Sequence, residues 1–166
     1  MDINKCIKII ENSIKDPTKG LPEDIFLFLT RLSPLINVDL LIKNPQNQTL
    51  LTWRQAGQSY GQGWHVPGGI VRYKEKISNR IHAVAESELK TKVIFDAIPL
   101  AVNEILLKQI NRGHFISLLY SCKLIQDPDI NLKHLKGAPK IGEWAWHDSC
   151  PDTLIFPHKM VYKNFI

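Results

Sequence analysis

The clearest periodic pattern in the chain lies between Lys76 and Lys90, where apolar side chains recur every three or four residues. This spacing places them on one face of a helix, so we expect a helix over residues 76–90. Five positions share one arc of that helix: Ile77, Ile81, Val84, Ala85 and Glu88. Glu88 is the only acid on this otherwise apolar face, and a carboxylate in such a place needs a partner.

A turn signal precedes this helix. The paired glycines of Pro67-Gly68-Gly69 permit positive φ and a close approach of a ligand, and residues 70–72 read as a short strand after them. The stretch from Gln55 to Gly63 is polar and rich in glycine. We expect it to form a mobile loop beside a pocket.

The remaining apolar runs predict a chain of helices and strands. Residues 35–43 have few polar breaks and predict a buried strand, and the turn 44–47 leads into a returning strand over 49–54. Other elements are expected at 25–32 (helix), 92–97, 100–107, 114–122 and 143–146 (strands), and 157–165 (helix). Asp39 lies inside the first strand, where a carboxylate needs a donor, either a structural arginine or a bound ligand.

The first residues form a separate pattern. Apolar side chains from Ile3 to Ile14 recur at helical spacing and predict an amphipathic helix that stops near residues 16–20. This helix packs on the domain's own surface, or it forms a dimer contact or a cover over a site. We therefore divide the chain into an N-terminal extension, 1–20, and one domain, 21–166.

Composition narrows the class of protein. The chain has 166 residues, 44% of them hydrophobic, which is enough for one globular domain with a core. No apolar run is long enough to cross a membrane, and the charged N-terminus does not resemble a secretory signal. The net charge of +5 is dispersed, which favours a polyanionic small ligand over nucleic acid. Three widely spaced cysteines fit free thiols in a reducing cytoplasm.

The turn and the helix together resemble the Nudix box, G-x5-E-x7-R-E-U-x-E-E-x-G-U, where U is aliphatic. Gly69 matches the first glycine, Glu75 the first glutamate and Glu88 the last glutamate, and the box is entered through W-x-V-P-G-G. Several positions depart from the pattern, among them Ala83 for the arginine, Val84 and Ser87 for two acids, and Lys90 for the late glycine. The resemblance implies an α/β (α+β) Nudix fold, a mixed sheet sandwiched between helices.

Residues 21–44 and 50–54 further resemble the GDP-mannose mannosyl hydrolase branch of the Nudix superfamily, which also lacks several box acids. The likeness is strongest before Leu89. It implies hydrolysis of a nucleotide sugar to free sugar and nucleoside diphosphate, and it suggests a homodimer. The implied cofactor is Mg²⁺, or Mn²⁺, held by the Gly69 carbonyl and the Glu88 carboxylate.

The same resemblance assigns the substrate contacts. Arg54, at a strand end, can grip a diphosphate bidentately and stabilise it as a leaving group. Asp39 matches an acid in the substrate site of that branch. Arg72, after the glycines, is a candidate phosphate contact or a solvated strand end, and His158 is a candidate for lining a nucleoside pocket or a solvated histidine.

The general base of that branch has no counterpart here. Lys140 and Ile141 occupy the matching positions of the late loop. The residues that could act as the base instead are His134, Glu143 and His65. Three functions remain open on these residues. They are a Mg²⁺-dependent nucleotide-sugar hydrolase, a Nudix-fold protein that binds nucleotide sugars without turnover, and a nucleoside diphosphate-X pyrophosphatase.

Overall fold

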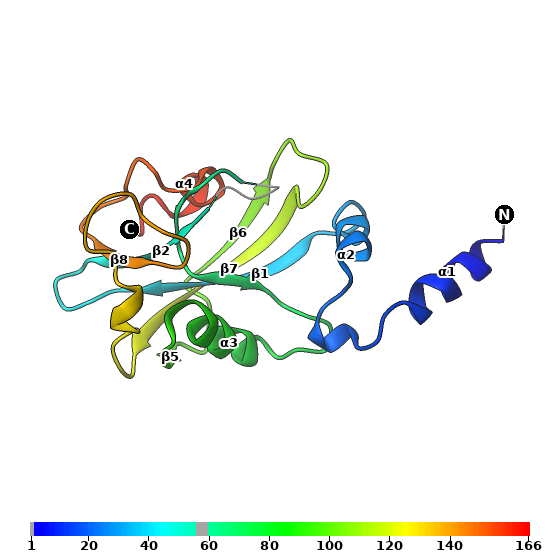
Figure 1. The fold of residues 1–166 in the computed structure, drawn as a ribbon, viewed down its shortest axis with the longest axis horizontal. Coiled ribbons are helices and arrows are strands. Elements are labelled where there is room, and N and C mark those ends of the chain that lie inside the picture. The colour runs from blue at the N-terminus through cyan, green and yellow to red at the C-terminus, as the bar shows by residue number, and fades with distance from the viewer. Residues whose placement is uncertain (1, 56–59) are drawn as a thin grey trace.

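The computed structural model describes residues 2–55 and 60–166 of the chain. The expected mobile loop over 55–63 therefore includes four residues, 56–59, that lie outside the described part. Two β-sheets form the centre of the molecule (Figure 1).

The larger sheet has the strand order β4-β1-β7-β5, and β6 also pairs with β7. Its strands are β1 (Leu35–Ile42), β4 (Gly68–Ile70), β5 (Val93–Phe95), β6 (Ala101–Leu106) and β7 (His114–Leu124). β1 runs parallel to β7, whereas the other pairs are antiparallel, so the sheet is mixed. The smaller sheet is antiparallel and consists of β3 (Gly63–His65), β2 (Thr49–Arg54) and β8 (Trp144–His147) in that order.

The described residues form four α-helices: α1 (Ile3–Asn12), α2 (Glu23–Leu29), α3 (Ile77–Leu89) and α4 (Phe156–Tyr162). Short 3₁₀ turns lie at Pro17–Lys19 and Ile130–Leu132. α3 ends at Lys90, which adopts the left-handed conformation (φ 53°) that glycine usually provides at this place. No helix in the described residues is both long and apolar enough to span a membrane.

The period of two along β1 divides the core into two clusters. Val38, Leu40 and Ile42 pack with the buried face of α3. Leu41 points the other way and packs with residues of the smaller sheet and of α4, among them Tyr162. Asp39 lies on that second face, because it is two positions before Leu41, and it is therefore directed between the two sheets.

The structure confirms the mixed fold class and the helix expected over 76–90. The expected strand over 70–72 is wrong in its bounds, because β4 pairs Gly68 with Asp39 and Ile70 with Asn37. The expected positive φ at the paired glycines is also wrong, since neither residue has one. These glycines are strand residues. Their lack of a side chain allows neighbouring side chains to pack closely against the backbone, and it is not needed for a turn.

α1 extends away from the two sheets (Figure 1). No residue of this helix is buried, and its isoleucines Ile3, Ile7 and Ile9 are exposed. Of the readings that the sequence leaves open, packing of α1 on its own domain is therefore wrong for the conformation described. The division of the chain at residue 20 stays a prediction.

Deleting residues 1–15 tests that division. Because α1 buries nothing against the remaining chain, we expect the truncated protein to keep the thermal midpoint of the full chain within about 2 °C. Circular dichroism at a low protein concentration measures it. A fall of several degrees would show instead that the extension belongs to the folding unit.

Candidate functional site

A cavity of about 170 Å³ is lined by residues of both sheets and of α4. Its polar lining includes Asn37, Asp39, Arg54, His65, Arg112 and His158. Five residues that the sequence singled out meet there, namely Asp39, Arg54, His65, Gly69 and His158.

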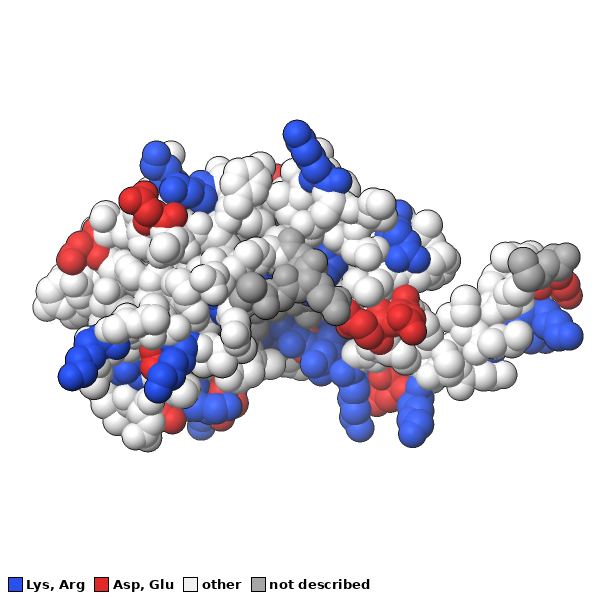
Figure 2. Space-filling model, turned by 45° about the horizontal axis from the view of Figure 1, so that its top comes forward, with Lys and Arg blue, Asp and Glu red and all other residues white. Residues whose placement is uncertain are grey.

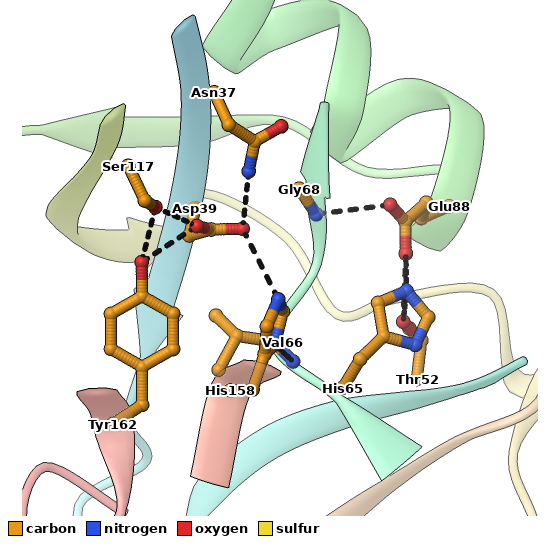
Figure 3. A network of polar contacts seen from close by, with 10 residues as sticks. All are labelled: Asn37, Asp39, Thr52, His65, Val66, Gly68, Glu88, Ser117, His158 and Tyr162. Atoms are coloured by element: carbon orange, nitrogen blue, oxygen red, sulfur yellow. Dashed lines mark hydrogen bonds and ion pairs between the residues drawn. The ribbon is translucent and has the colours of Figure 1, made fainter. Parts of the chain in front are cut away.

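Asp39 is the only acid among the described residues that line the cavity, and it is buried, with an exposed fraction of 1%. Figure 3 shows its polar contacts. Its Oδ2 accepts hydrogen bonds from Ser117 Oγ and from the Tyr162 hydroxyl, the latter at 2.6 Å. Its Oδ1 accepts one from Asn37 Nδ2 at 2.9 Å. Burial raises the pKa of Asp39 to about 6, although these three hydrogen bonds act to lower it. The donors of Asp39 are thus two hydroxyls and an amide, and no arginine is needed.

His158 lies beside Asp39 at the start of α4. Its Nδ1 accepts a hydrogen bond from the Val66 amide at 3.0 Å, so Nε2 carries the hydrogen of the neutral ring. This Nε2 is 3.9 Å from Asp39 Oδ1. Burial holds the pKa of His158 well below its usual value, and the nearby charge of Arg54 acts in the same direction. His158 is therefore a neutral donor facing the cavity.

Gly68 lies between the cavity and α3, and its backbone is in close contact with side chains of both. A Cβ at Gly68 would overlap Asp39 Oδ1, and a Cβ at Gly69 would lie 2.9 Å from Val84 Cγ2. The Gly68 amide donates a hydrogen bond to Glu88 Oε1 at 3.0 Å. Only glycine allows β4 to approach both carboxylates in this way.

Glu88 projects from α3 toward both sheets (Figure 3). Its Oε2 accepts from the Thr52 hydroxyl at 2.7 Å and lies 3.1 Å from His65 Nε2. Burial raises the pKa of Glu88, but the interaction with His65 and the hydrogen bonds from Thr52 and Gly68 outweigh this effect, so the pKa falls below its usual value. Glu88 is an ionised carboxylate with three donors.

The protonation of His65 follows from this contact. Thr52 gives its only hydroxyl hydrogen to Glu88, and the ionised Glu88 has none to give, so His65 Nε2 carries the hydrogen between them. In the neutral ring, Nδ1 is then an acceptor. His65 Nδ1 is buried and has no hydrogen-bond partner within residues 2–55 and 60–166.

Two arginines occupy another side of the cavity. Arg54 ends β2 and Arg112 lies in the turn before β7, and their guanidinium carbons lie 5.3 and 5.6 Å from the centroid of the Tyr60 ring. The Nε atoms of both arginines are buried without an acceptor in the described part of the chain, where neither arginine forms an ion pair. Burial lowers the pKa of Arg54, and the charge of Arg112 lowers it further. Both groups are placed to receive an anion.

Comparison of the chain with known proteins identifies its fold. A MutT Nudix hydrolase from Burkholderia pseudomallei superposes with a TM-score of 0.56 at 20% identity, over 77% of this chain and 95% of that one. The chain has the Nudix fold. A UDP-X diphosphatase superposes with a TM-score of 0.50 at 18% identity, over 87% of this chain and 79% of that one.

Sequence comparison reaches less far. No family model matches the chain. The low-salt glycan biosynthesis protein Agl8 of Haloferax volcanii is 31% identical over 86 residues, or 52% of this chain. The match covers 54% of the relative, so the chain spans about half the length of the curated protein it resembles.

The metal ligands implied by the Nudix box do not form a cation site here. Within residues 2–55 and 60–166, no three acidic, histidine or cysteine side chains gather in a group that could hold a metal. Val84 is in the core, and the Ser87 hydroxyl donates to the Val84 carbonyl, so neither supplies an acid. Both oxygens of Glu88 already accept donors from the protein. The donor set therefore does not fit a divalent cation bound by Gly69 and Glu88.

Other candidates lie away from the cavity. Arg72 is exposed and lines a second, largely apolar hollow near α2, so the structure does not bring it together with Arg54. Glu75 forms an ion pair with Arg80 of α3 at 2.8 Å. On the late loop, Glu143 accepts from His134 at 2.8 Å and from the Lys140 amide, and this group does not line the cavity.

Arg112 and Tyr60 were not among the residues that the sequence singled out. Arg112 sits in an Asn-Arg-Gly turn and reaches Tyr60 only through the folding of distant segments, so local pattern gave no signal. Asn37 and Ser117 did carry one. Both are polar positions in apolar strands, and the parallel ladder places them opposite each other beside Asp39.

Replacing Glu88 by alanine should destabilise the protein. The change leaves the Gly68 amide, the Thr52 hydroxyl and His65 Nε2 without their acceptor, and each unsatisfied buried donor costs about 1–3 kcal/mol. We expect the free energy of unfolding in urea to fall by about 3 kcal/mol or more. Glu86→Ala, exposed on the same helix, is the control and should stay within about 0.5 kcal/mol. Equal effects of the two variants would contradict this account of Glu88.

The raised pKa of Asp39 predicts a pH dependence. The folded carboxyl binds its proton more tightly than an ordinary carboxyl, with a pKa of about 6 instead of 3.8, so its contribution to stability falls as the pH rises through this window. Asp39→Asn removes this titration. Between about pH 4 and pH 7, the free energy of unfolding of the variant should gain roughly 2–3 kcal/mol relative to that of the unaltered protein. A difference that does not change with pH would show that Asp39 titrates normally.

Proposed function

We propose that the protein hydrolyses a nucleotide sugar and that Arg54 and Arg112 hold its diphosphate. The observation that carries the proposal is the position of these two buried guanidinium groups in one cavity, without an acidic partner in the described residues. Like charges at close range repel each other, and a diphosphate with its several negative oxygens offsets both. The solved UDP-X diphosphatase with this fold supports a substrate of the nucleoside diphosphate-X class.

The sugar would lie against Asp39 and its neighbours. Asn37, Asp39 and His158 line the same cavity and offer an amide, a carboxylate and an imidazole N–H, groups that form hydrogen bonds with sugar hydroxyls. The relative named for glycan biosynthesis supports a sugar as the group linked to the diphosphate. GDP-mannose, the substrate implied by the sequence resemblance, is the first compound to test.

The reaction proposed is attack of water on the anomeric carbon. The bond from that carbon to the diphosphate breaks, a carbon–hydroxyl bond forms, and the nucleoside diphosphate leaves with its charge stabilised by the arginines. The proton of the water passes to an acceptor in the cavity. His65 Nδ1 is the acceptor that the geometry offers, because Glu88 holds the hydrogen of the ring on Nε2.

Two alternatives are retained. Binding of a nucleotide sugar without turnover is favoured by Val84 and Ser87, which replace acids of the Nudix box with a core side chain and a hydroxyl bonded to the backbone. A pyrophosphatase that cuts between the two phosphates is compatible with the fold. The two enzymes differ in their products, and the binding protein gives none.

The cofactor, the oligomer and the location are kept as predictions of the sequence. Mg²⁺ or Mn²⁺ is implied by the resemblance, but the donor set around Glu88 does not fit it, so the proposed reaction does not depend on it. A homodimer and a cytoplasmic location are likewise predictions. Size-exclusion chromatography with light scattering tests the first of these two.

A panel of nucleotide sugars tests the proposal. The protein is incubated with GDP-mannose, UDP-glucose and UDP-N-acetylglucosamine, and the products are separated by anion-exchange chromatography. Free sugar and nucleoside diphosphate are expected. Arg54→Ala should lower kcat by about 10²-fold or more, because it removes one of the donors to the leaving group.

The control for this assay is Lys123→Gln, which removes one positive charge at an exposed position of β7 outside the cavity. Its rate should equal that of the unaltered protein. Sugar phosphate and nucleoside monophosphate as products would support the pyrophosphatase instead. Saturable binding with no product would support the binding protein, and neither binding nor product would refute all three.

A further inference from the structure

The charged side chains that line the cavity are mainly positive. Arg54 and Arg112 both face the cavity, and Asp39 is the only acid among its lining residues in the described part of the chain. Glu88 lies behind His65 and does not line the cavity. The cavity thus has two fixed cations where a metal-dependent site gathers carboxylates around a cation.

The two acids near the cavity are also occupied. Asp39 accepts three hydrogen bonds, from Asn37, Ser117 and Tyr162. Glu88 accepts from three donors on three different strands. A divalent cation at either carboxylate would have to displace these hydrogen bonds from the protein, which is costly.

Unlike the two acids, Arg54 and Arg112 have hydrogen-bonding atoms without a partner in the described residues. Tyr60 orders both of them, since its ring lies beside each guanidinium group and its hydroxyl donates to the Arg112 carbonyl at 2.9 Å. The buried Nε–H of each arginine has no acceptor among the described residues. The two guanidinium groups are planar and permanently charged, and each can form two parallel hydrogen bonds with the oxygens of a diphosphate. In a metal-dependent site, Mg²⁺ neutralises these oxygens by coordinating them.

We infer that this site binds the diphosphate of its ligand without a divalent cation, with Arg54 and Arg112 together taking the place of the metal ion. The inference rests on the proposed function, because it specifies how the same cavity neutralises the same ligand. It adds that binding of the ligand needs no metal ion, which neither the fold nor the sequence resemblance implies.

Isothermal titration calorimetry of the full chain tests this inference. GDP-mannose, GDP and inorganic pyrophosphate are titrated in metal-free buffer with EDTA, and again with excess Mg²⁺. We expect binding in EDTA, with a dissociation constant within about threefold of that in Mg²⁺. Pyrophosphate measures the diphosphate contacts apart from those of the base and the sugar.

Variants identify the groups responsible. Arg54→Gln and Arg112→Gln should each weaken binding in EDTA by about tenfold to a hundredfold, because each removes charged donors to the diphosphate. Lys123→Gln should bind normally. Circular dichroism checks that each variant is folded, and Arg112→Lys, which keeps the charge but loses the fork, should bind with intermediate strength.

Each outcome decides one of the two proposals. Binding only in Mg²⁺ would overturn the inference and leave the proposed function standing. Binding in EDTA that is unchanged in both glutamine variants would also overturn it, because the arginines would then not be the receiving groups. Absence of binding under both conditions would refute the proposed function as well.

Discussion

Two carboxylates, the buried Asp39 and the partly buried Glu88, fix the geometry of this molecule. Glu88 of α3 accepts donors from Thr52 on β2, His65 on β3 and Gly68 on β4, so one side chain joins the helix to both sheets. Asp39 of β1 plays the same part toward β7 and α4 through Ser117 and Tyr162. Gly68 contacts both acids, and the cavity lies where their networks meet. Moving any of these donors would change the shape of the cavity.

Stability alone does not explain such networks. Burying a charged group is costly, and well-packed apolar residues of similar volume give at least equal stability. The networks instead hold polar atoms at defined positions in an otherwise apolar space between two sheets. His65 and His158 show the effect, because the partner at one ring nitrogen determines whether the other is an acceptor or a donor. Orientation of these rings is what the buried acids contribute to the site.

Much of the fold could be predicted from local pattern, but the contacts of the site could not. The 3.6-residue period gave α3 and showed that Glu88 points inward, and apolar runs located β1 and β2. The partner of Glu88 depends on the register that pairs Thr52 with His65, which no local signal specifies. The alignment with the Nudix box matched Glu88 to a metal ligand, yet a matched position does not determine which donors surround it. Arg112 was missed because a turn residue gains its role only when distant strands bring it to Tyr60.

In the proposed function, the departures from the Nudix box and the presence of Arg112 beside Arg54 complement each other. Val84 lies so close to Gly69 that an acid at this position would sit against the glycine strand, where a cation would need it. With valine there, the contact is apolar and belongs to the core between α3 and β1. In the proposed function, a ligand with several negative charges must be neutralised, and this helix face does not supply carboxylates that would recruit a metal. Arg54 and Arg112, which line the cavity, supply positive charge instead.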